Sequence, residues 1–108
     1  MANDRQRQLA TSTTDAITAG NQVAFTLGAQ LFRHGNKPLV SIKGLATTET
    51  VTFYIRVGDT WEELADSAGN QQIFTATRTG DTFNTPGVYG YIKDATAAAI
   101  YLYVNDAR

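Results

Sequence analysis

The chain has 108 residues, 43% of them hydrophobic, and its 9 basic and 10 acidic side chains give a formal net charge of −1. This length and composition suit one domain with a single modest core. The charges are scattered along the chain, which argues against binding to nucleic acid or to an anionic membrane. Cysteine is absent, which excludes disulfides, thiol nucleophiles and cysteine-ligated metal sites.

The first 20 residues carry little apolar surface. After Met1, the large apolar side chains of this segment are Leu9 and Ile17, too few to offset the entropy lost on ordering. We therefore expect residues 1–20 to form a flexible N-terminal arm, either disordered or ordered only against a neighbouring subunit, and residues 21–108 to form the domain. No apolar run suits a signal peptide or a membrane span, so we expect the chain to be made in a cytoplasm.

Alternation of apolar and polar side chains begins at Gln22. In the run 23–31, Gly28 predicts a bulge within one long strand or a corner between two strands. A turn follows at 33–38, and a strand at 39–43 ends at Gly44.

The clearest pattern in the chain is Thr50–Leu64. The apolar side chains of its first half share one parity, which gives an extended chain one apolar face: Val51, Phe53, Ile55 and Val57. Gly58 and Asp59 then favour a tight reversal, and a second extended run carries Trp61. This pattern predicts a β-hairpin in the middle of the domain, with Trp61 as a core anchor.

Further short strands are expected before the end of the chain, separated by turns. They span 72–77, 82–85, 88–93 and 100–104. No segment offers about 10 to 12 residues of helical periodicity. The sequence therefore predicts an all-β fold, a single antiparallel β-sandwich of jelly-roll or immunoglobulin-like type with about seven to nine strands.

No group in the sequence forms a motif for catalysis or for a cofactor. His34 is the only histidine and lies in a turn, where a catalytic triad or a metal site would need partners from elsewhere in the fold. The glycines form no phosphate-binding loop. We therefore expect no enzyme activity, cofactor or metal, although a spatial pair of carboxylates stays open. The densest acidic group lacks the spacing of a calcium loop and is interpreted as a solvated hairpin: Asp59, Glu62, Glu63 and Asp66.

The tyrosines carry the main prediction of a site. All five lie on the parity opposite to the aliphatic residues of their strands, so we expect their rings to face outward: Tyr54, Tyr89, Tyr91, Tyr101 and Tyr103. Three interpretations stay open, namely ring pairs on a wet sheet face, an interface with a subunit or partner, and a platform for sugar rings.

Three stretches of the chain resemble small β-sandwich virion proteins of tailed bacteriophages. They are Val51-Thr-Phe-Tyr-Ile-Arg-Val-Gly-Asp-Thr-Trp-Glu-Glu-Leu64, Phe83-Asn-Thr-Pro-Gly-Val-Tyr-Gly-Tyr-Ile-Lys93 and Ile100-Tyr-Leu-Tyr-Val104. The likeness covers roughly residues 39–105 and lies in β-hairpins with one Trp and a Pro-Gly-Val-Tyr strand. Residues 1–38 match no part of it.

The resemblance implies a head decoration or cement protein, an oligomer and often a trimer, which clamps neighbouring coat subunits of the virion. Its partner would be a phage coat protein or another virion protein, and edge strands and the tyrosines are the expected contacts. Two other hypotheses stay open. One is a carbohydrate- or receptor-binding module of a phage tail or fibre, and the other is a small hydrolase that uses His34.

Overall fold

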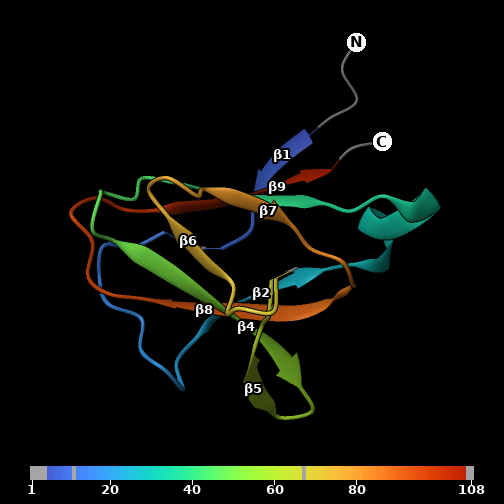
Figure 1. Ribbon diagram of the computed structural model, residues 1–108, viewed down its shortest axis with the longest axis horizontal. Coiled ribbons are helices and arrows are strands. Elements are labelled where there is room, and N and C mark those ends of the chain that lie inside the picture. Colours follow the sequence, from blue (N-terminus) through green and yellow to red (C-terminus); the bar gives the residue numbers. More distant parts are fainter. Residues whose placement is uncertain (1–4, 11, 67, 107–108) are drawn as a thin grey trace.

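The predicted hairpin of residues 50–64 forms as expected and lies at one end of one of two antiparallel sheets (Figure 1). The computed structural model describes residues 5–10, 12–66 and 68–106. In chain order the elements are β1 (Arg5–Gln8), β2 (Val23–Leu27), the 3-10 segment η1 (Ala29–Gly35), β3 (Leu39–Lys43), β4 (Thr50–Val57), β5 (Thr60–Glu63), β6 (Ile73–Thr75), β7 (Gly80–Thr82), β8 (Gly87–Lys93) and β9 (Tyr101–Asp106).

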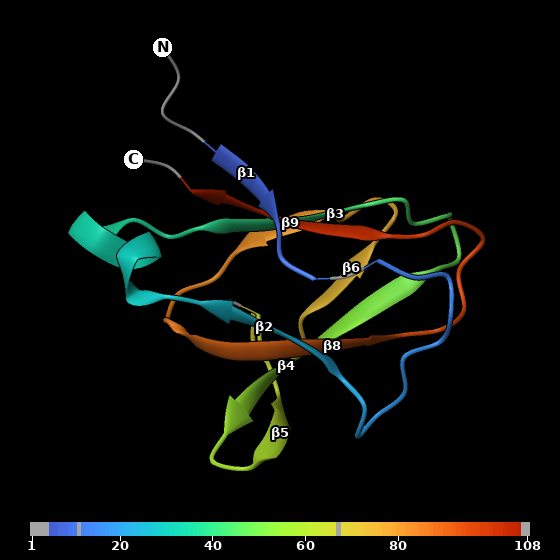
Figure 2. The same cartoon turned by 180° about the vertical axis from the view of Figure 1, so that it is seen from behind.

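The two sheets lie face to face and form an antiparallel β-sandwich, as Figures 1 and 2 show from opposite sides. Sheet A has the strand order β1-β9-β3-β7, and sheet B has the order β2-β8-β4-β5. One edge of β4 serves two partners, because β6 pairs with residues 50–52 and β5 pairs with residues 54–57. The prediction of an all-β sandwich is confirmed. No helix in the described ranges is long and apolar enough to cross a membrane.

The core between the sheets is built around aromatic rings. Phe53 of β4 lies 4.6 Å from Phe74, 5.7 Å from Phe83 and 6.1 Å from Phe25, measured between ring centroids. Edge-to-face and tilted pairs of this kind add about 0.5–1.5 kcal/mol each to the gain from burial. Aliphatic side chains from both sheets complete the core, among them Leu27, Val40, Val51, Leu102 and Val104.

The structure differs from the expected flexible arm at residues 5–10 and 12–20. Strand β1 pairs along β9 at the edge of sheet A, and the main chain of Ile17 exchanges two hydrogen bonds with Lys93, at 2.8 and 3.0 Å. Ile17 is also buried in the core. The segment is ordered by partners about 75 to 100 residues away in the sequence. The prediction considered only the low apolar content of the segment itself. The first four residues of the predicted arm lie outside the described residues.

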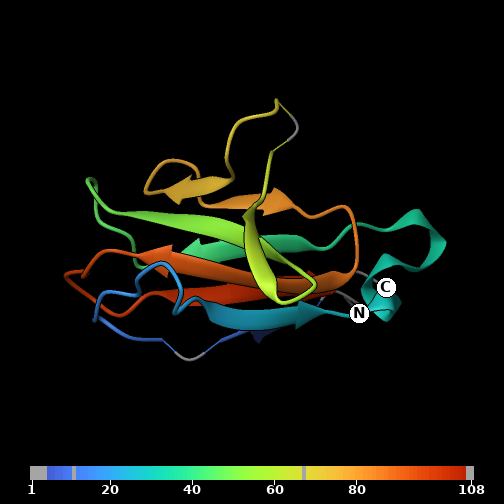
Figure 3. The same cartoon turned by 90° about the horizontal axis from the view of Figure 1, so that it is seen from below.

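Two further expectations are corrected at the ends of strands. The run 23–31 is neither one strand nor two, because β2 ends at Leu27 and η1 follows Gly28 directly. The tip of the central hairpin leaves the core, so the side chain of Val57 is exposed although it shares the parity of Phe53. Figures 1 and 2 show the hairpin of β4 and β5 projecting away from the sandwich, and Figure 3 views it from below, in front of the strands.

Candidate functional site

Tyr101 and Tyr103 form a pair on the outer face of sheet A. They point away from the core because Leu102 and Val104, on the other parity of β9, are buried. Their ring centroids lie 6.5 Å apart with an angle of 31° between the planes. The neighbouring residues of β3 are Ser41, opposite Tyr103, and Lys43, opposite Tyr101. We call this surface, together with Leu39 of β3, the β9 tyrosine face.

Tyr89 and Tyr91 do not face outward, which corrects the prediction for these two residues. They are only 1% and 2% exposed, and their rings pack on Phe25 in the core. The aliphatic Val88 of the same strand is exposed instead. Alternation correctly predicts that Tyr89 and Tyr91 share one face of β8 and Val88 lies on the other. The prediction of which face is buried is wrong, because the larger aromatic rings bury more apolar area. The Tyr89 hydroxyl donates to the Thr85 carbonyl, and burial raises the pKa of Tyr91.

Tyr54 and Trp61 lie on the outer face of sheet B, so Trp61 is not the predicted core anchor. Tyr54 is half-buried opposite Gly90 of β8. The indole of Trp61 covers Gly90, where an added Cβ atom would lie 2.8 Å from Trp61 Cη2. The guanidinium carbon of Arg56 lies 5.1 Å from the centre of the indole, a cation–π distance. The five tyrosines therefore lie in three places and form no common site.

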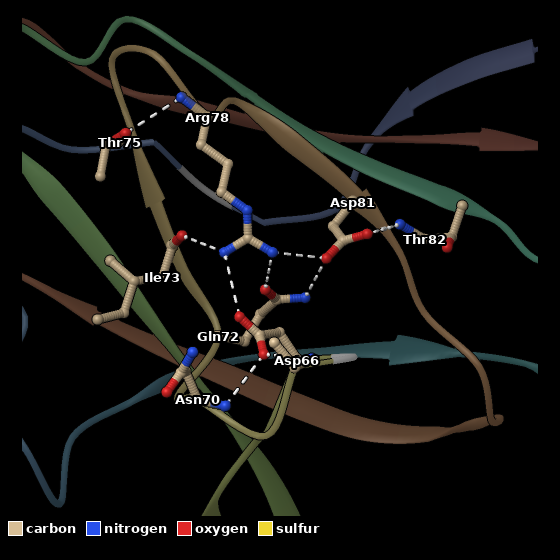
Figure 4. Close-up of polar contacts among 9 residues, drawn as sticks. Asp66, Asn70, Gln72, Ile73, Thr75, Arg78, Asp81 and Thr82 are labelled. Carbon is tan, nitrogen blue, oxygen red and sulfur yellow. Dashed lines mark hydrogen bonds and ion pairs between the residues drawn. The ribbon is translucent and has the colours of Figure 1, made fainter.

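A polar cluster that the sequence did not predict lies beside β6 and β7 (Figure 4). We call it the Arg78 cluster, and it consists of Asp66, Gln72, Arg78 and Asp81. Arg78 Nη2 donates to Gln72 Oε1 at 2.8 Å and to Asp81 Oδ2 at 2.7 Å. Arg78 Nη1 donates to the carbonyl of Ile73 and lies 3.7 Å from Asp66 Oδ2. One guanidinium thus contacts both carboxylates of the cluster.

The Arg78 cluster connects the two sheets. Asp81 belongs to β7 of sheet A, whereas Gln72 precedes β6 of sheet B and accepts a main-chain hydrogen bond from Phe53 of β4. Gln72 is 3% exposed, and its amide nitrogen donates to Asp81 Oδ2 at 3.1 Å. A buried amide with both ends paired avoids the free-energy cost of an unsatisfied polar group.

Asp66 also orders the loop before β6. Its Oδ1 accepts from the main-chain N–H groups of Ala68 at 2.9 Å and Asn70 at 3.0 Å. The other members of the predicted acidic group, at positions 59, 62 and 63, are exposed on the central hairpin. The spacing of acidic residues gave no sign of this division, because Asp66 meets Arg78 and Asp81 only through the fold.

A cavity of about 380 Å³ opens beside the Arg78 cluster. Its lining combines the two carboxylates with hydroxyl, amide, ammonium and aromatic groups from five stretches of the chain. The lining residues are Lys37, Leu64, Ala65, Asp66, Gln72, Asp81, Thr82, Phe83, Asn84, Thr85 and Tyr89.

His34 is exposed in the turn that ends η1, where its φ angle of 61° is left-handed. Within the described ranges, no group of three or more histidine and acidic side chains is placed to hold a metal ion.

Comparisons with known proteins add no relative to these observations. No protein-family model matches the chain. Searches of curated proteins and of solved structures found no similar protein.

Proposed function

We propose that this chain is a structural protein of a tailed-bacteriophage virion, a head decoration or cement protein that binds coat subunits through protein–protein contacts. The observation that carries the proposal is the β9 tyrosine face, on which two aromatic rings and the 36% exposed Leu39 lie together on the outside of sheet A. The resemblance of residues 39–105 to small virion proteins supports it. The protein would be made in the host cytoplasm and act in the virion.

The shape of sheet A supports contact with another protein. Ser41 and Gly80 lie side by side in β3 and β7, and neither raises a large side chain above the sheet. Tyrosine is enriched at protein interfaces because it offers a large, stiff ring with few rotatable bonds and a hydroxyl that can stay hydrogen-bonded. We therefore propose that a partner surface packs on the rings of Tyr101 and Tyr103.

Strand edges support an oligomer. Strands β1 and β7 lie at the two ends of sheet A, and β2 lies at one end of sheet B. An edge strand exposes main-chain donors and acceptors that another chain can pair with, and closed symmetric assembly is one way to cover them. We propose a homo-oligomer, with a trimer as the form to test first.

Binding to phage capsids tests the proposal directly. Purified protein is mixed with undecorated capsids of the phage that encodes it, and the bound fraction is measured after sedimentation. The double variant Tyr101→Ala with Tyr103→Ala should lose binding. The matched control is Tyr54→Ala, which truncates a half-buried tyrosine on the outer face of sheet B and should bind normally.

Two results would contradict the proposal. One is that the wild-type protein does not bind capsids at all. The other is that the double variant, with an unchanged far-ultraviolet spectrum, binds as well as the Tyr54→Ala control. Light scattering coupled to size exclusion gives the mass of the free protein in solution. A strict monomer at every concentration would contradict the proposed homo-oligomer.

A further inference from the structure

We propose that the cavity beside the Arg78 cluster binds a neutral, hydroxyl-rich ligand, a single sugar ring at the end of a glycan. This inference does not depend on the proposed virion function, and it places sugar recognition away from the exposed rings of Tyr101 and Tyr103. A cavity of about 380 Å³ lies within the usual range of small-ligand sites, roughly 300–1,000 Å³.

The charges around the cavity favour a neutral ligand. Two carboxylates, Asp66 and Asp81, line it, and Arg78 contacts both of them at 3.7 and 2.7 Å. Lys37 contributes a positive charge to the lining, to which Arg78 itself does not belong. Because Lys37 and the two carboxylates all line the cavity, an anion or a cation that enters it would meet charges of both signs. A neutral ligand avoids the cost of desolvating its own charge.

The carboxylates are held in fixed positions and still have acceptor capacity. Asp66 uses Oδ1 for two main-chain N–H groups, and Asp81 uses Oδ2 for Gln72 and Arg78 and Oδ1 for the N–H of Thr82. An ionised carboxylate offers about four acceptor positions. Each aspartate can therefore accept one more hydrogen bond, from a ligand hydroxyl, at a carboxylate whose orientation is already fixed.

The rest of the lining supplies hydrogen-bonding groups and some apolar surface. The amide of Asn84 makes no hydrogen bond to another described side chain or main-chain group, and the Thr85 hydroxyl meets that of Tyr89 at 3.2 Å. Phe83 and Tyr89 are only 3% and 1% exposed, so they close the cavity from behind, and the apolar surface open to a ligand comes from Leu64 and Ala65. A sugar ring presents hydroxyl groups around its rim and C–H groups on its faces, so it can use both kinds of surface.

The test titrates the isolated protein with free glucose, galactose, mannose and N-acetylglucosamine, followed by amide NMR shifts. At least one sugar should give saturable shifts at Asp66, Thr82, Asn84 and Thr85. The variant Asn84→Ala should lower the affinity for that sugar by about tenfold or more, the loss expected when one hydrogen bond to the bound ligand is removed. Asn21→Ala, which truncates an exposed asparagine outside the cavity, should leave binding unchanged.

Several results would overturn the inference. They are the absence of saturable shifts with all four sugars, shifts centred on Trp61 or on Tyr101 and Tyr103, and equal loss of binding in Asn84→Ala and Asn21→Ala. Glycerol is titrated as a separate arm, and shifts as strong as those of the best sugar would reject sugar recognition in favour of general polyol binding. Capsids play no part in this test, so its outcome is separate from that of the virion proposal.

Discussion

The ammonium group of Lys93 donates a hydrogen bond to the main-chain oxygen of Asp15 at 2.6 Å, across 78 residues of sequence. Lys93 is 4% exposed at the end of β8, and its Nζ also reaches the Thr96 hydroxyl at 3.2 Å and the Asp94 carbonyl at 3.3 Å. One side chain thus holds the segment before Ile17 and the loop after β8 together. Burial lowers the pKa of Lys93, while nearby carboxylates, Asp15 first, favour its charged form.

Replacing this lysine should loosen both segments. In Lys93→Met the apolar stem is kept but the carbonyl of Asp15 and the hydroxyl of Thr96 lose their donor, so we expect a loss of about 1–3 kcal/mol in the free energy of unfolding. Urea unfolding followed by circular dichroism measures it. Lys43→Met, on exposed sheet surface, is the control and should change stability by less than about 0.5 kcal/mol. Equal stability of the two variants would show that the hydrogen bonds of Lys93 add nothing.

The raised pKa of Tyr91 predicts a loss of stability at alkaline pH. Its hydroxyl stays neutral in the folded protein above pH 10.0, the ordinary value, whereas in the unfolded chain it ionises there. The folded state then binds more protons, so stability is full below pH 10.0 and falls as the pH rises above it. The slope for one group is about 1.4 kcal/mol per pH unit.

The comparison with Tyr91→Phe isolates this contribution. Both proteins share Lys93 and the other titrating groups, so the wild-type free energy of unfolding minus that of Tyr91→Phe should be constant below pH 10.0 and should fall above it. Urea unfolding at a series of pH values measures the difference. A constant difference across the alkaline range would contradict the prediction.

The sequence predicted best where the signal is local. Alternation and the turn at Gly58 are contained within a few residues, and the hairpin at 50–64 formed as expected. The N-terminal segment was missed because β1 gains its order from β9, at the other end of the chain. Tyr89 and Tyr91 were placed on the wrong side because alternation does not say which face is buried.

The candidate site was even less visible in the sequence. Arg78 and Asp81 lie in a turn and a short strand without periodicity, and Asp66 lies in a loop that looked solvated. Their contacts form because the chain passes from sheet B at β6 to sheet A at β7. The burial of Gln72, which lies between a polar loop and an apolar strand, is what distinguishes this region in the structure. Nothing in the sequence indicates that this glutamine is buried.

Gly90 provides the space that Trp61 fills. A Cβ atom at this position would lie 2.8 Å from Trp61 Cη2 and 2.9 Å from Gln22 Cβ, both closer than such contacts allow. In Gly90→Ala the indole should be displaced towards solvent, at a cost of about 1–3 kcal/mol in stability. Trp61 is the only tryptophan, so a red shift of its fluorescence reports the displacement. In a Trp61→Ala background the same glycine change should cost clearly less, and an equal cost there would show that the indole is not the obstacle.

Arg78 should contribute more to the stability of the fold than its partly exposed position suggests. Its side chain is 40% exposed, so its ion pairs alone would contribute little. However, Arg78→Met removes the donor to the oxygen of the buried Gln72 and leaves Asp66 and Asp81 without their shared cation, so we expect a loss of about 1–3 kcal/mol. Arg78→Lys should recover only part of it, because an ammonium cannot reproduce the forked N–H groups that contact Gln72, Ile73 and Asp81 together.

The matched control for this change is Arg33→Met. Arg33 is exposed, and its side chain makes no hydrogen bond or ion pair within the part of the chain that the structure describes. Urea unfolding of the three variants should rank them Arg33→Met, Arg78→Lys and Arg78→Met in order of decreasing stability. If Arg78→Met were as stable as Arg33→Met, the cluster would not connect the sheets energetically, and the fixed carboxylates on which the sugar site depends would lose their support.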